Sequence, residues 1–160
     1  MATTHGFDDP LLVDYQEDLE LLAASCSPRG SELLGQIVEI LIAQILRGRG
    51  FVRLNRQLVS ELGEAREELA SINAVLGTSH KLVVLPASEL QADPEDIDAL
   101  PLFEALRAEI LSDSDEANEA VDEVKRVFKG KAKACARSRD QANRRQTALA
   151  EMDSFRRQLG

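Results

Sequence analysis

Two heptad repeats of apolar residues, one in each half of the chain, restrict the possible folds more than any other feature of the sequence. The first repeat alternates steps of four and three residues through Phe51, Asn55, Leu58, Leu62, Ala65, Leu69, Ile72 and Leu76. With Phe51 at heptad position d, Asn55 lies at position a and is the only polar member. This spacing is typical of an α-helix that buries one face against a neighbouring helix.

The same register continues towards the N-terminus, where additional apolar side chains widen the stripe over residues 33–46. A wide stripe indicates several partner helices rather than one two-stranded seam, and it is not expected to stay bare. The candidate interface residues along this helix are Leu34, Ile37, Leu41, Phe51, Asn55, Leu58, Leu62, Leu69, Ile72 and Leu76.

One long helix is therefore expected over residues 31–77. Ser31 follows the break "SPRG" and is a candidate N-cap, while Gly77 directly follows the last periodic residue and suits the C′ position. Gly48 and Gly50 permit a bend. The polar residues Gln44 and Asn55 either specify the register of helix packing or face solvent where the stripe drifts, and the sequence leaves both open.

A second long helix is expected over residues 114–160. One seam position recurs every seven residues at Val121, Phe128, Cys135, Ala142 and Leu149. Its companion position holds Val124, Lys131, Ser138, Arg145 and Met152, so the seam is apolar at both ends and polar between residues 131 and 145. Asp113 or Ser114 can cap its start, and no proline follows. At the usual rise per residue such a helix is about 70 Å long.

Two long helices of similar length predict an all-α fold: a long antiparallel helical hairpin or coiled coil with a small head, packed into a larger helical bundle or a homodimer. Aromatic residues make up only 4% of the chain and Trp is absent, which disfavours a β-sandwich. Residues 1–30 are expected to form an acidic N-terminal segment whose short helix, 11–25, packs on the wide stripe. Residues 78–113 are expected to form the head.

Within the head, "KLVVL" at 81–85 is the only strand-like run. A short helix is expected over 100–111, with Pro101 in its first turn. The carboxylates of "DPEDID", 93–98, lack the spacing of a calcium loop and are expected to lie in a solvated turn.

The sequence contains no motif for catalysis, a cofactor or a metal. His5 and His80 stand outside any metal-ligand spacing, and neither a phosphate-binding loop motif nor a nucleophile elbow is present. The run "RGRG", 47–50, resembles a phosphate loop only in composition. We therefore expect no enzyme activity, no cofactor and no metal.

The chain has no run of about 18 apolar residues, so no membrane span is expected. Its acidic start predicts no signal peptide. Cys26 and Cys135 share no motif, which favours an intracellular, reducing compartment, cytoplasmic or nuclear, over a disulfide framework. Cys135 is expected to be a small buried residue of the helix seam.

Charge is spread very unevenly along the chain, whose net charge is −9. In the predicted hairpin residue 31 faces residue 160 and residue 77 faces residue 114, so the glutamates of 61–68 face the basic residues of 125–131. Midway along it, eight arginines gather with only Asp140 nearby: Arg47, Arg49, Arg53, Arg56, Arg137, Arg139, Arg144 and Arg145. Like charges held together destabilise a fold unless something neutralises them.

The sequence is compatible with three kinds of partner that would neutralise these arginines. The first is an acidic segment of this chain or of a second copy, such as 8–20 or 93–123. The second is an acidic surface of another protein. The third is a phosphate-bearing ligand or nucleic acid, which guanidinium groups bind in a bidentate manner. The net negative charge and the scarcity of aromatic residues disfavour nucleic acid.

The sequence thus predicts a non-catalytic scaffold, adaptor or assembly subunit that acts through coiled-coil surfaces and binds protein partners or its own copy. The alternative is a regulator or sensor that binds an anionic, phosphate-bearing ligand or nucleic acid at the eight arginines.

Overall fold

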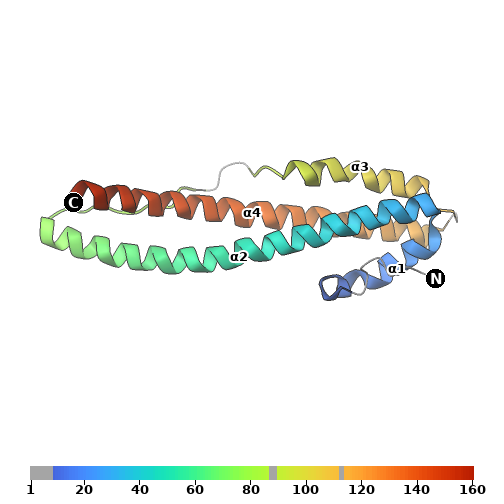
Figure 1. Cartoon of the computed structure of the whole chain (residues 1–160), viewed down its shortest axis with the longest axis horizontal. Coiled ribbons are helices and arrows are strands. Elements are labelled where there is room, and N and C mark those ends of the chain that lie inside the picture. Colours follow the sequence, from blue (N-terminus) through green and yellow to red (C-terminus); the bar gives the residue numbers. More distant parts are fainter. Residues whose placement is uncertain (1–8, 87–89, 112–113) are drawn as a thin grey trace. The chain divides into compact units, whose positions relative to one another are not determined.

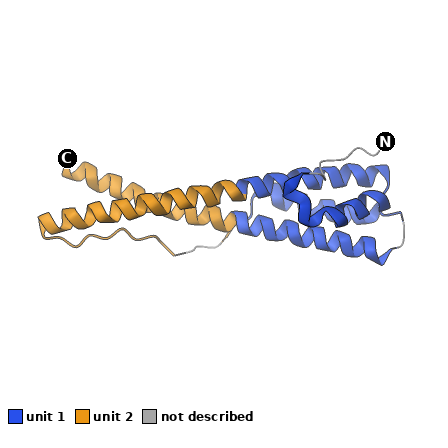
Figure 2. Cartoon of the chain, turned by 90° about the horizontal axis from the view of Figure 1, so that it is seen from below, with its two compact units in different colours: residues 1–47, 92–135 blue, residues 48–91, 136–160 orange. Residues whose placement is uncertain are grey.

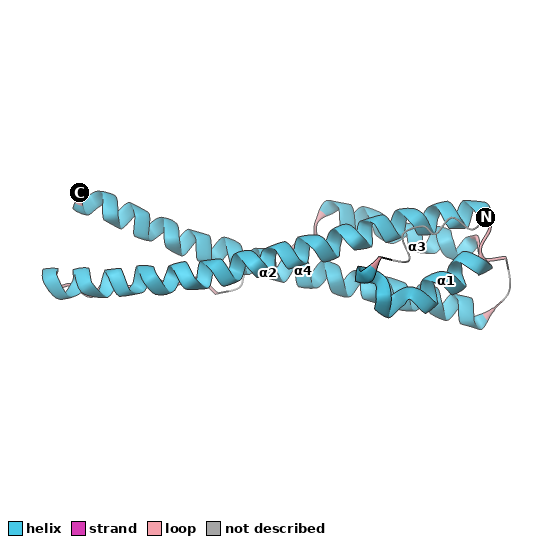
Figure 3. Cartoon of the chain, turned by 60° about the horizontal axis from the view of Figure 1, so that its bottom comes forward, coloured by secondary structure: helices cyan, strands magenta, loops and turns pink. Residues whose placement is uncertain are grey.

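The computed structural model describes residues 9–86, 90–111 and 114–160, and every regular element within those ranges is a helix (Figure 3). In chain order they are the 3-10 helix η1 (Pro10–Tyr15) and the α-helices α1 (Gln16–Ser25), α2 (Pro28–Leu76), α3 (Pro94–Ala108) and α4 (Asp115–Leu159) (Figure 1). The all-α prediction is confirmed, and α2 and α4 are the two long helices that the heptad repeats indicate.

The chain divides into two compact units, each of which contains part of both long helices (Figure 2). Unit 1 comprises residues 1–47 and 92–135, and unit 2 comprises residues 48–91 and 136–160. In α2 the boundary falls between Arg47 and Gly48. This is the point at which the wide apolar stripe of the sequence gives way to a narrow seam.

The core of unit 1 is built around the wide stripe of α2. Each fully buried Leu or Phe side chain contributes about 1.5–3 kcal/mol. The segment 11–25 packs on the stripe, as its apolar spacing predicts, and α3 and α4 cover the rest of it. The core residues are Leu12, Leu19, Leu22, Cys26, Leu34, Ile37, Val38, Leu41, Ile45, Ala99, Phe103, Leu106, Ala120, Val121, Val124, Val127 and Phe128.

The start of α2 is fastened to the end of α3. The Ser27 hydroxyl accepts a hydrogen bond from the Gly30 N–H (3.1 Å) and donates to Glu109 Oε2 (2.6 Å). Ser27 is therefore the N-cap and Pro28 takes the first helical position, so the predicted cap at Ser31 is wrong. Gly30 has no room for a Cβ atom, because one would lie 2.6 Å from Cys26 Cβ.

Within unit 1, α3 is antiparallel to both long helices. Against α2, the end of α3 meets Ser27, whereas Asp96 near its start accepts a hydrogen bond from Gln44 (2.8 Å). Against α4, Phe103 meets Phe128 edge-to-face with ring centroids 5.3 Å apart, and the later Arg107 pairs with the earlier Asp122. Since α3 is antiparallel to each, α2 and α4 run in the same direction here.

The same direction is found in unit 2. Asn55 of α2 forms hydrogen bonds with Ser138 and Arg145 of α4, and Glu68, further along α2, bonds with Arg156, further along α4. The predicted antiparallel pairing of the two long helices is therefore wrong.

The glutamates of 61–68 consequently do not face residues 125–131. Within unit 1, Lys125 pairs with Glu104 of α3, and Arg126 pairs with Glu123 in the preceding turn of α4. The physical reason is the connection: residues 77–114 are long enough to carry the chain back before α4 begins, as parallel neighbours in a bundle require.

The connector does not fold into the predicted head. Described residues between 78 and 91 have no regular secondary structure and run back along α4: Leu82 packs with Met152, the Leu85 carbonyl accepts from Arg144 (3.0 Å), and the Gln91 carbonyl accepts from Arg139 (2.5 Å). The strand-like run 81–85 is thus an extended segment without a strand partner. In place of a compact head, it lies on α4 in unit 2, while α3 packs in the core of unit 1.

α3 begins earlier than predicted. Pro94 takes its first helical position, and Glu95 and Asp96 lie in its first turn, where carboxylates favour the helix dipole. The segment 93–98 is therefore a helix start rather than a solvated turn. Pro101, expected in the first turn, lies inside the helix. It is tolerated because Pro101 and Ile97 are both exposed, so water can reach the carbonyl that the proline leaves without a donor.

The end of α2 agrees with the sequence. The helix ends at Leu76, and Gly77 follows it with φ of 68°, in the left-handed region that glycine adopts without strain. Gly77 is thus the C′ residue that the sequence predicts.

Two leucines of the same region provide a test of the unit 1 core. Leu106 is fully buried and Leu111 is 76% exposed. We expect Leu106→Ala to lower the free energy of unfolding by about 2–5 kcal/mol, because it leaves a cavity among packed side chains. Leu111→Ala should change it by less than about 0.5 kcal/mol. Urea denaturation followed by circular dichroism measures both, and equal effects would contradict this core.

Candidate functional site

The eight arginines singled out in the sequence have different environments. Arg47 belongs to unit 1, and the other seven belong to unit 2. Four are hydrogen-bonded or ion-paired with described residues of their own unit, namely Arg47, Arg139, Arg144 and Arg145. The remaining four, Arg49, Arg53, Arg56 and Arg137, are exposed and make no such contact with a described residue.

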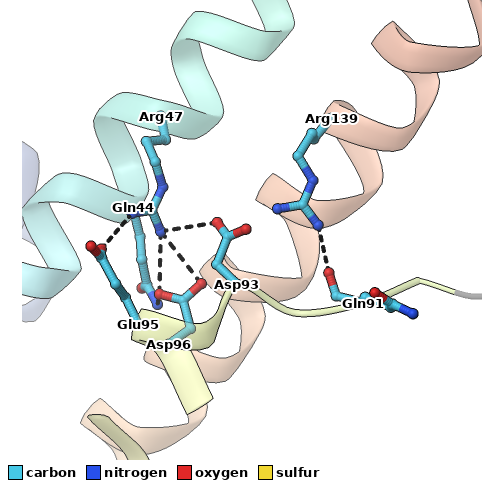
Figure 4. Close-up of polar contacts among 7 residues, drawn as sticks. All are labelled: Gln44, Arg47, Gln91, Asp93, Glu95, Asp96 and Arg139. Carbon is cyan, nitrogen blue, oxygen red and sulfur yellow. Dashed lines mark hydrogen bonds and ion pairs between the residues drawn. The ribbon is translucent and has the colours of Figure 1, made fainter. Parts of the chain in front are cut away.

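Arg47 is neutralised by the start of α3. Its guanidinium lies 3.2 Å from Asp96 Oδ1, 3.3 Å from Glu95 Oε2 and 3.5 Å from Asp93 Oδ2 (Figure 4). Asp96 is only 3% exposed, and its Oδ1 also accepts a hydrogen bond from Gln44 Nε2 (2.8 Å). A buried carboxylate needs such partners, so this cluster belongs to the packing of α3 on α2.

The neighbours of Arg47 favour the charged form of its guanidinium. Burial by itself lowers the pKa of the guanidinium, but the Cys135 sulfur and the Asp96 carboxylate raise it, and the net pKa lies above its ordinary value. For this arginine the neutralising partner is an acidic segment of the chain itself, within the range 93–123 considered from the sequence. Gln44 is buried and bonded rather than solvent-facing.

Asn55 joins the two long helices of unit 2. It is 8% exposed, and its Nδ2 donates to the Ser138 carbonyl (2.8 Å) and to the Phe51 carbonyl (2.9 Å). Its Oδ1 accepts from Arg145 (2.8 Å). Of the two alternatives left open by the sequence, the buried one is realised, and these directional bonds favour a single register of α2 against α4.

Two further arginines hold the extended segment. Arg144 forms an ion pair with Asp140 (2.9 Å) and donates to the Leu85 carbonyl. Figure 4 shows the second contact, in which Arg139 donates to the Gln91 carbonyl. Within the polar part of α4, 131–145, these two arginines thus bond backbone carbonyl groups of the extended segment, whereas the seam residue Arg145 bonds the Asn55 side chain.

A shallow groove of about 360 Å³ lies between α2 and α4 in unit 2. The described residues that line it combine exposed apolar side chains with two guanidinium groups and include no carboxylate: Val52, Asn55, Arg56, Val59, Ser138, Gln141 and Arg145. Val52 is 43% and Val59 is 53% exposed. Apolar residues beside a helix seam in this way commonly contact a further helix.

Sequence reasoning missed these valines, although a signal is present. With Phe51 at position d, Val52 and Val59 both fall at position e, one heptad apart, next to the seam. The seam itself accounts for the buried residues, so apolar e positions mark a second, adjoining face.

The candidate interface residues of the sequence are mostly covered within the chain. Leu34, Ile37 and Leu41 lie in the unit 1 core, and Leu58, Leu62 and Leu69 are buried in unit 2. Asn55 is also buried, Phe51 and Ile72 are half-buried, and only Leu76 is largely exposed, at 53%. The helices that cover the wide stripe are α1, α3 and α4 of the same chain, so its burial requires no second molecule.

Both cysteines are free and buried, and Cys135 is 1% exposed, as its seam position predicts. Among the described residues, no group of three histidine, cysteine or acidic side chains lies close enough together to hold a metal ion. No helix in the described ranges combines the length and apolar character needed to cross a membrane.

No protein-family model matches the chain, and no curated protein or solved structure is detectably similar to it.

The Arg47 cluster yields a matched pair of variants on one helix. We expect Arg47→Met to lower the free energy of unfolding by about 1.5–3 kcal/mol, because it removes charged hydrogen-bond donors from the buried Asp96 carboxylate. Arg49→Met, which breaks no hydrogen bond or ion pair with a described residue, should change it by less than about 0.5 kcal/mol. Thermal and urea unfolding measure both, and an Arg47→Met protein as stable as the Arg49→Met protein would refute the role of the cluster.

Proposed function

We propose that the protein is a non-catalytic assembly or adaptor module that binds an acidic amphipathic helix of a partner protein in the α2–α4 groove of unit 2. The observation that carries this proposal is the groove itself, in which exposed Val52 and Val59 lie beside Arg56 and Arg145 and the described lining contains no carboxylate. The described side chains that line the groove offer no carboxylate, imidazole or thiol for catalysis, which favours binding over turnover.

The apolar part of the groove supports a helical occupant. Val52 and Val59 are seven residues apart, about two turns of α2, which is the spacing that the apolar face of a third helix would meet. Leu58 and Leu62 beside them are buried in the seam between α2 and α4, whereas the two valines are exposed and can contact an additional partner. A helix that lays its apolar face into such a groove is a common mode of recognition.

Charge supports an acidic occupant. Arg49, Arg53 and Arg56 follow one another at helical spacing, and the first acidic residue after them in α2 is Glu61. None of the three is paired with a described residue, whereas Arg47 and Arg144 have carboxylate partners of their own. Carboxylates of a partner would therefore relieve repulsion that the described part of unit 2 leaves in place.

An intracellular, reducing compartment belongs to the same proposal. It is supported by the two free thiols, both of which are buried in unit 1.

The second candidate is a regulator that binds a phosphate-bearing ligand or nucleic acid at the same arginines. The exposed guanidinium groups of Arg53 and Arg56 favour it, since such groups bind phosphate in a bidentate manner. The exposed valines have no role in that function, and this is why we place it second.

A synthetic peptide with leucine and glutamate heptads tests the proposed function. We expect saturable binding by fluorescence anisotropy that weakens as salt rises. Val52→Asp combined with Val59→Asp should weaken binding at least about tenfold, a loss of about 1.4 kcal/mol. Val75→Asp, at an 85% exposed site outside the groove, should leave binding unchanged.

Three outcomes would overturn the proposal. Peptide binding that is absent, or equal in the groove variant and in the Val75→Asp control, excludes the groove as its site. A dimer in light scattering that the groove variant dissociates makes a second copy the occupant. A labelled single-stranded oligonucleotide that binds more tightly than the peptide, and that loses affinity with Arg56→Glu, favours the second candidate.

A further inference from the structure

We propose that unit 2 contains a second, independent binding site, a cleft at the C-terminal end of α2 that accepts a small organic anion with an apolar body. The cleft has a volume of about 530 Å³, within the usual size range of small-molecule pockets. It lies between the last turns of α2 and the loop that follows Gly77, apart from the residues of the docking groove.

The loop that forms one wall is fixed by a single side chain. Asn73 Nδ2 donates to the His80 carbonyl (2.9 Å), while Asn73 Oδ1 accepts from the His80 N–H (3.2 Å) and from the Thr78 hydroxyl (2.8 Å). The Thr78 N–H also donates to the Asn73 carbonyl (3.1 Å). The wall is thus organised before any ligand arrives, which lowers the cost of ordering it on binding.

The floor of the cleft is apolar. Leu69 and Leu82 line it, and both belong to the small core cluster of unit 2 together with Ala65 and Met152. The floor can therefore contact an apolar ligand body without losing its own packing.

The rim of the cleft is basic. Arg66 and Lys81 line it together with His80, and none of the described lining residues is a carboxylate, although the net charge of the chain is −9. Neither Arg66 nor Lys81 makes a hydrogen bond or ion pair with a described residue. The neighbouring carboxylate of Glu68 is occupied by Arg156, whose hydrogen bond lowers the pKa of Glu68.

The imidazole ring of His80 is held in place at the rim by an aromatic contact. Its ring packs against Phe155 of α4 with centroids 4.9 Å apart, which holds the imidazole at the edge of the cleft. A basic rim above an apolar floor fits an anionic head group attached to an apolar chain or ring. A free inorganic anion would make no apolar contact with the floor, and a neutral apolar molecule would make no ionic contact with the rim.

Isothermal titration calorimetry with octanoate as the probe tests this site. We expect saturable binding of octanoate and at least tenfold weaker binding of 1-octanol and of inorganic phosphate. 1-Octanol lacks the negative charge that the rim would bind, and phosphate lacks the apolar chain that the floor would contact. Arg66→Gln and Lys81→Gln should each weaken octanoate binding about fivefold or more. Arg53→Gln, on the same helix but outside the cleft, should not change it.

The site is excluded if octanoate shows no saturable binding, if 1-octanol binds as tightly as octanoate, or if both charge variants bind octanoate normally. Phosphate that binds as tightly as octanoate excludes the apolar floor from recognition. Because Val52→Asp with Val59→Asp lies outside the cleft, it should leave octanoate binding intact, so failure of this site and failure of the docking groove are separately measurable.

Discussion

Burial of the wide apolar stripe of α2 is the constraint on which unit 1 depends. Leu34, Ile37 and Leu41 are almost completely buried, and a face this broad needs cover from more than one side. The segment 11–25, α3 and α4 all contribute to the core around it. Beyond Arg47 the apolar face narrows to a seam, and in unit 2 the partners of α2 are α4 and an extended segment.

Polar side chains beside the apolar faces specify the register in which the helices pack, which hydrophobic burial alone does not. Apolar contacts are non-directional and tolerate several registers. Gln44 and Arg47 bind one buried carboxylate, Asp96, and so specify where α3 starts on α2. Asn55 performs the corresponding task in unit 2 by bonding the Ser138 carbonyl and Arg145. These bonds come at some cost in stability and favour one arrangement over its alternatives.

The same pairings separate the arginines that hold the fold from those that remain available. Arg47 and Arg144 have carboxylates of their own unit as partners, and Arg145 has an amide. Arg53 and Arg56 have no such partner among the described residues, and Arg56 lines a groove with two exposed valines. The proposed docking surface thus combines Arg56, for which the described residues supply no partner, with Arg145, which Asn55 holds in place.

The sequence by itself determined the two long helices, the short helical segment on the stripe, the end of α2 at Gly77 and the polar part of the α4 seam. Each follows from local spacing or from a residue with a special backbone preference. Only the tertiary structure decided that α2 and α4 run in the same direction, because a heptad pattern specifies a buried face equally well for either direction. It also decided that α3 starts at Pro94. The ion pairs of Asp93, Glu95 and Asp96 with Arg47 likewise depend on the tertiary structure, since they join residues far apart in the chain.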